Sequence, residues 1–143
     1  MKNNMKALTL PQALAVIMTF SYGFRVFWRG IFWFKEQDSV LQDSQFYSAL
    51  HDLLPIWSWG IFVAVSGLIL IASALFIGSS QQSKICSYLL LVGGFMVALL
   101  YFFMTSASIF NAINWLTTVH MAIMSATGLI VAFVGGADIA KRG

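Results

Sequence analysis

The chain has 143 residues, of which 59% are hydrophobic and only 9% are charged. A typical soluble domain carries about 25% charged residues, so these few charges cannot cover a surface that faces water. The composition therefore excludes a soluble globule and, because it is so apolar, also a disordered chain. The basic residues behind the net charge of +3 are scattered, so we expect no nucleic-acid partner.

Long stretches without charged residues locate four candidate membrane spans. The first extends from Ala7 to Phe24 and stays apolar to Phe34, the second from Leu53 to Ser83, and the third from Ile85 to Ala137, interrupted only by His120. About 20 apolar residues cross a bilayer as a helix, so the third stretch holds two spans. We predict one all-α integral membrane domain over residues 1–143, a bundle with spans at about 9–33, 55–77, 84–106 and 114–135.

Local signals agree with these ends. Thr9, Pro11 and Gln12 supply an N-cap, a first-turn proline and a capping-box partner for the first helix. Pro55 opens the second helix and the 78–80 Gly-Ser-Ser run closes it, while the small and polar run 105–108 separates the third helix from the fourth. The pair Gly135-Gly136 suits the end of the fourth helix.

The connection between the first two spans, residues 35–54, is the one segment of soluble character. Asp43 or Ser44 can cap a short helix within it, with Asp52 on its polar side. We predict that this amphipathic helix lies on the outer surface of the bundle. Its apolar face would comprise Phe46, Tyr47, Leu50, Leu53 and Leu54.

The basic residues in the short flanks predict the orientation. Five of them fall on the side of the two termini (Lys2, Lys6, Lys84, Lys141 and Arg142), and three on the other side (Arg25, Arg29 and Lys35). We therefore expect both termini in the cytoplasm and the 35–54 loop outside. The first span carries no small-residue cleavage site, so it is interpreted as an uncleaved span of a cell-membrane protein, with a bacterial plasma membrane as the expected location.

Ionisable groups inside a membrane are functional candidates, and three are found here: Arg25, Arg29 and His120. The arginines are four residues apart and share a helix face. Either they extend to lipid phosphates beside the interfacial tryptophans, or Arg25 binds an anionic or carbonyl-bearing ligand or an acid of the loop. His120 either makes an interhelical hydrogen bond or joins that site. Together with Trp57 and Trp59, these residues form the predicted ligand-binding set in the outer third of the bundle.

Small residues at helical spacing predict close helix packing in lipid. They are Gly60, Ala64 and Gly67 in the second span, Gly94 and Ala98 in the third, and Gly128, Ala132 and Gly136 in the fourth.

The sequence contains no nucleophile–base pair, no nucleotide loop and no metal-ligand cluster, and Cys86 is the single cysteine. We therefore expect a non-enzymatic protein without cofactor, whose partners are the bilayer and a lipid, a small apolar ligand or a membrane protein, including a second copy of itself. A holin-like pore-forming oligomer is a further alternative, although no span shows the continuous polar stripe that a water-filled lumen needs.

The plan of four short spans with a long outer loop after the first resembles that of the small DoxX-type membrane proteins. The likeness covers the hydropathy layout of most of the chain, including the Leu53-Leu54-Pro55 entry into the second span. It rests on layout and not on a matched motif. The resemblance implies a quinone-binding or electron-transfer accessory role, which is the alternative function.

Overall fold

The computed structural model describes residues 8–36, 38, 41, 45–77, 84–111 and 114–142. The described residues form five helices and no strands: α1 (Leu10–Lys35), α3 (Gln45–Leu53), α4 (Ile56–Ile77), α5 (Lys84–Asn111) and α6 (Trp115–Arg142). Four of these helices, all except α3, are long and apolar enough to cross a membrane. The fold is thus all-helical with four candidate membrane spans.

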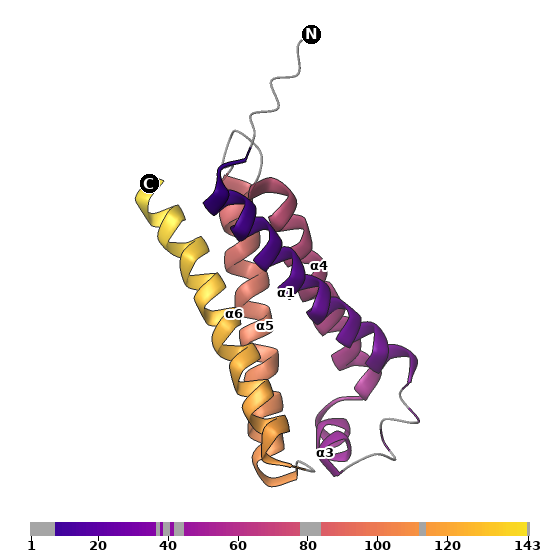
Figure 1. Ribbon diagram of the computed structural model, residues 1–143. Helices are drawn as coiled ribbons and strands as arrows, with labels where there is room; N and C mark the ends of the chain where they lie inside the picture. Colours follow the sequence, from indigo (N-terminus) through magenta and orange to yellow (C-terminus); the bar gives the residue numbers. More distant parts are fainter. Residues whose placement is uncertain are drawn as a thin grey trace.

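The four long helices pack as two antiparallel pairs, α1 with α4 and α5 with α6, and the pairs meet where α4 packs against α5. Figure 1 shows that α1 begins and α6 ends at the same end of the bundle, which we call the terminus end. The opposite end, where α1 ends and α4 begins, holds the short helix and is called the α3 end.

Glycines allow the helices of each pair to approach closely. A Cβ atom built on Gly60 would lie 2.8 Å from the carbonyl oxygen of Gly30, and one on Gly128 would lie 2.7 Å from the backbone nitrogen of Ala98. Both distances are shorter than real Cβ contacts allow. Close backbone approach of this kind is the main source of helix association in lipid, where apolar side chains gain nothing from leaving the solvent.

The predicted packing residues lie at these crossings, with one exception. Gly60 and Gly67 of α4 face α1, with Ala64 between them, and Gly94 and Ala98 of α5 face Gly128 and Ala132 of α6. In place of Gly136, its neighbour Gly135 makes the close contact, because its Cβ would lie 2.6 Å from the backbone nitrogen of Leu91. A Cβ on Gly136 would meet only the Cδ1 atom of Leu91, at an ordinary 3.6 Å.

The third helix does not end at residue 106, as the sequence predicted, but continues to Asn111. The reason is that the hydroxyl groups of the 105–108 run donate to carbonyl oxygens of the preceding turn instead of breaking the helix. Thr105 Oγ1 lies 2.7 Å from the Tyr101 carbonyl and Ser106 Oγ lies 3.1 Å from that of Phe102. Each polar side chain is thereby satisfied within its own helix.

The fourth helix likewise continues past the expected end at residue 135 and reaches Arg142. No described glycine has a positive φ angle, so Gly135 and Gly136 do not form a C-cap. The last turns are instead held by the Asp138 carboxylate, which accepts a hydrogen bond from Ser87 on α5 and lies 2.9 Å from Arg142 Nε. At the start of α1, the expected capping interaction is present, because the Thr9 N–H donates to Gln12 Oε1 at 3.1 Å.

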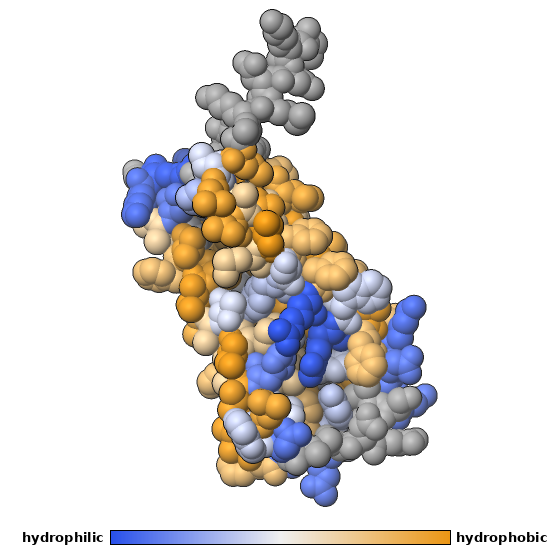
Figure 2. Space-filling model, in the orientation of Figure 1, coloured by the Kyte–Doolittle hydropathy of each residue, from blue (hydrophilic) through white to orange (hydrophobic). Residues whose placement is uncertain are grey.

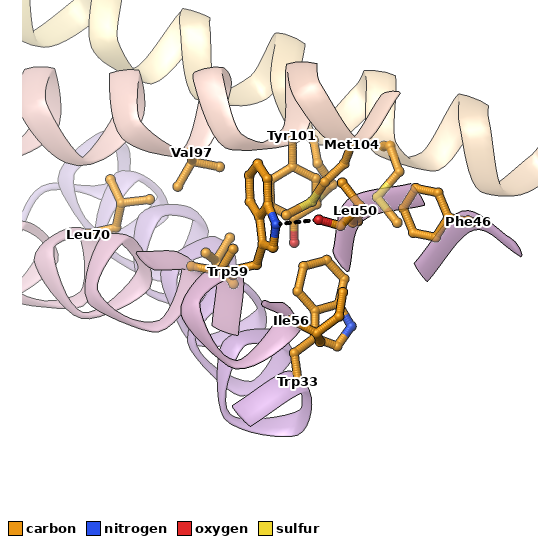
Figure 3. Close-up of a cluster of buried hydrophobic side chains, with 13 residues drawn as sticks. Trp33, Phe46, Leu50, Ile56, Trp59, Leu70, Val97, Tyr101 and Met104 are labelled. Atoms are coloured by element: carbon orange, nitrogen blue, oxygen red, sulfur yellow. Dashed lines mark hydrogen bonds between the residues drawn. The ribbon is translucent and has the colours of Figure 1, made fainter. Parts of the chain in front are cut away.

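Helix α3 covers the α3 end of the bundle. Phe46 and Leu50 are buried, whereas Leu53 and Leu54 are 68% and 45% exposed, so the buried face is narrower than the sequence predicted. Figure 3 shows these two side chains in a cluster with Trp33, Ile56, Trp59, Tyr101 and Met104. The predicted capping residues Asp43 and Ser44 lie outside the described residues.

Candidate functional site

Two polar contacts join α1 to α6, which lie in different helix pairs. The Tyr22 hydroxyl donates to the Met124 carbonyl oxygen at 2.6 Å. One helical turn further along α1, Arg25 Nη2 lies 3.2 Å from Nε2 and 3.4 Å from Nδ1 of His120. The sequence placed Arg25 and His120 at similar depth, and in the structure they are in contact.

The geometry of the Arg25–His120 contact is not that of a simple hydrogen bond. A neutral imidazole has one acceptor nitrogen and one N–H nitrogen, which point in different directions, so a donor aligned with the acceptor nitrogen lies far from the other nitrogen. Because Arg25 Nη2 is almost equidistant from both nitrogens, it is not aligned with either one. The donors of Arg25 are therefore still able to bind an additional acceptor.

Arg29 lies one turn further along the same face and is more enclosed. Its guanidinium carbon is 5.4 Å from the centroid of the Trp33 ring, a cation–π arrangement. Arg29 Nε and Trp33 Nε1 are both buried, and neither has a hydrogen-bond partner among the described residues. Trp33 itself is fully buried, so two unpaired donors lie next to each other inside the bundle.

Neither arginine is neutralised by a carboxylate in the part of the chain that the structure describes. The ion pair found there joins Asp138 to Arg142 at the terminus end, away from Arg25 and Arg29. Figure 2 shows hydrophilic side chains gathered over α1 and α6 in the half of the molecule nearer α3, with hydrophobic side chains around them. The cluster thus combines two positive charges, a histidine and unpaired donors in apolar surroundings.

The predicted tryptophans do not belong to this cluster. Trp59 is buried, and its Nε1 donates to the Leu50 carbonyl at 3.1 Å, which ties α4 to α3 (Figure 3). Trp57 is 45% exposed on the outside of α4. Trp59 therefore packs in the core, and Trp57 lies on the surface.

Three residues that pack at this cluster were not identified from the sequence: Tyr22, Trp33 and the buried Tyr101 of α5, which shares the hydrophobic core with Trp33. A signal for two of them was present. Tyr22, Arg25, Arg29 and Trp33 follow one another at spacings of three, four and four, which places them on one face of α1. Tyr101 is brought in only by the packing of α5.

No group of three or more His, Cys, Asp or Glu residues within the described ranges is arranged to hold a metal ion. Comparison with models of protein families, with curated proteins and with solved structures found no match for this chain. The function is therefore argued from the cluster itself.

Proposed function

We propose that this chain is a four-span membrane protein that binds an anionic membrane lipid from the side, with the lipid headgroup between Arg25 and Arg29. In this proposal the protein is not an enzyme. The observation that carries it concerns the described residues: among them, the two arginines have no carboxylate partner, and the buried donors of Arg29 and Trp33 have no hydrogen-bond partner.

The physical argument rests on the cost of charge in hydrocarbon. An arginine at the centre of a membrane helix costs at least about 2.5 kcal/mol, and an unsatisfied polar group adds several more. A phosphate or carboxylate between the two guanidinium groups removes both costs, because a planar guanidinium donates two parallel hydrogen bonds to such an anion. His120 adds a polar group from α6, and the Tyr22 hydroxyl of α1, which donates to the Met124 carbonyl, lies one turn before Arg25.

A quinone, the ligand of the alternative function, fits this cluster less well. Its carbonyl oxygens accept hydrogen bonds, yet a neutral molecule leaves both arginine charges uncompensated. A holin-like pore has no supporting observation, since large hydrophobic side chains cover much of the exposed surface of all four long helices. The quinone remains an outcome of the experiment below.

The experiment measures lipid retention on the purified protein by native mass spectrometry, after reconstitution into nanodiscs of mixed phosphatidylglycerol and phosphatidylcholine with identical tails. We expect phosphatidylglycerol to be retained preferentially, and inorganic phosphate not to displace it. Arg25→Lys should lose the preference nearly as completely as Arg25→Ala, because lysine lacks the planar fork. Lys35→Ala serves as the control, since Lys35 is an exposed cation at the end of α1.

Equal retention of both lipids by the unmodified protein would overturn the proposal. An Arg25→Lys variant with normal preference would overturn it as well, because a side chain that only extends to the interface needs a positive charge and not a planar guanidinium. Displacement by phosphate would indicate a site for a soluble anion. In nanodiscs to which a quinone is also added, retention of the quinone in place of either lipid would favour the alternative function.

A further inference from the structure

A groove lies between α1 and α6 on the terminus side of the arginine cluster. Its volume is about 290 Å³, near the lower end of the range for small-molecule sites. Ala15 and Thr19 line it from α1 and Val131 and Val134 from α6, while Leu90 of α5 closes it from behind.

The groove is almost entirely apolar. Its one acidic residue, Asp138, is already engaged by Ser87 and Arg142. The groove therefore has no unsatisfied charge to attract a headgroup, and only an apolar occupant matches its walls.

The groove and the arginines lie along the same side of α1, the side that faces α6. Ala15, Thr19 and Tyr22 precede Arg25 along the side of α1 that faces α6, as the groove lining and the Tyr22–Met124 bond show. Ala15 is ten residues before Arg25, which corresponds to about 15 Å along a helix that rises 1.5 Å per residue. A lipid tail reaches about the same distance, since the two leaflets share a hydrocarbon core of about 30 Å.

We infer that this groove holds one acyl chain of the lipid whose anionic headgroup lies between Arg25 and Arg29. The inference rests on the proposed function and adds the orientation of the ligand: headgroup toward the α3 end, tail toward the terminus end. The lipid therefore belongs to the leaflet on the α3 side. Because lipid tails are as apolar as the groove, a tail gains no hydrophobic free energy by entering it. The tail instead contributes van der Waals contacts with the groove walls, and the headgroup determines which lipid is selected.

The test uses phosphatidylglycerol with a photoactivatable diazirine near the end of one tail, in nanodiscs that contain the full chain. After illumination, mass spectrometry of proteolytic fragments locates the labelled residues. We expect labelling to concentrate on Thr19, Val131 and Val134. A phosphatidylcholine probe with the same tail should give at least severalfold less labelling there.

Two matched variants separate the tail from the headgroup. Ala15→Phe fills the groove, whereas Leu14→Phe adds the same ring at the neighbouring residue, which is 51% exposed and does not line the groove. We expect Ala15→Phe to lower groove labelling severalfold while the phosphatidylglycerol preference in native mass spectrometry is retained, and Leu14→Phe to change neither.

Normal lipid preference with labelling spread evenly over all lipid-facing residues would overturn the groove assignment and leave the proposed function intact. Unchanged groove labelling in Ala15→Phe would overturn it as well. If Arg25→Ala leaves both the lipid preference and the labelling unchanged, the proposed function is wrong and the inference with it.

Discussion

Two buried tryptophans at the α3 end differ in a single hydrogen bond. Trp59 donates to the Leu50 carbonyl at 3.1 Å, whereas Trp33 Nε1 has no partner among the described residues. From the sequence, Trp59 belongs to the predicted ligand-binding set and Trp33 does not, whereas, among the described residues, the structure leaves Trp33 as the one with the unpaired indole. Their difference matters because an indole that keeps its hydrogen bond contributes to stability, and one without a partner is a site at which a ligand acceptor can bind.

The first prediction compares the two tryptophans with the same substitution. Trp59→Phe should lower the free energy of unfolding by about 1 kcal/mol more than Trp33→Phe, because only the former loses a hydrogen bond. Unfolding in detergent free of anionic lipid measures both variants. Equal losses would mean that the Trp33 indole is not unpaired in the lipid-free protein.

The second prediction concerns the Tyr22 hydroxyl, which joins α1 to α6. Tyr22→Phe should lower the free energy of unfolding by about 0.6 kcal/mol, the average for a hydrogen bond between membrane helices. Tyr88→Phe is the control, because Tyr88 is 52% exposed on α5, and it should have no measurable effect. A loss of similar size in both variants would argue against the bond.

At the scale of elements, glycine position decides how closely two helices approach. Spacing in the sequence located the small-residue faces of α4, α5 and α6, but it did not distinguish Gly135 from Gly136. The two differ by about 100° around the helix axis, so only one of them can face α5. The packing of α6 selects Gly135.

The third prediction uses these adjacent glycines as a matched pair. Gly135→Ala should destabilise the protein by about 1–3 kcal/mol, because its Cβ would lie 2.6 Å from backbone atoms of α5. Gly136→Ala should be neutral or stabilising by up to about 1 kcal/mol, since alanine is the better helix former and its Cβ would make only an ordinary contact with Leu91 Cδ1. Thermal unfolding in detergent tests this, and a more stable Gly135→Ala variant would show that the helices are further apart.

For the whole molecule, the proposed orientation in the membrane rests on the basic residues. Lys84, Lys141 and Arg142 lie at the terminus end, whereas Arg25, Arg29 and Lys35 lie in the part of α1 nearer the α3 end. The proposal of cytoplasmic termini also fixes the leaflet from which the lipid is taken, because the arginine cluster is nearer the α3 end. It would then be the outer leaflet.

The fourth prediction tests this orientation by cysteine labelling of intact cells. Ser48→Cys on the exposed side of α3 should react with a membrane-impermeant maleimide, whereas Lys141→Cys should react only after the cells are permeabilised. Cys86 is 5% exposed and should stay unlabelled, which provides the background. Labelling of Lys141→Cys alone in intact cells would invert the orientation.

Composition and hydropathy were sufficient to predict the helical class, the four long apolar helices and the short amphipathic helix between the first two. These features follow from the need of a backbone in hydrocarbon to satisfy its own hydrogen bonds, which depends on local sequence. Helix ends were predicted less well. The polar run 105–108 predicts the end of a helix, but its hydroxyl groups donate hydrogen bonds to carbonyl oxygens within the same helix, which continues.

The candidate site was predicted only in part, for a related reason. Arg25, Arg29 and His120 stand out in any apolar sequence because charge there is rare. Which of them meet, and which donors remain unpaired, depends on the rotation of α1 relative to α6. The sequence determined which residues are costly to bury. Only the tertiary structure decided that Arg25 contacts His120 and that the buried donors of Arg29 and Trp33 have no partner among the described residues, because partners are set by how helices pack and not by their order along the chain.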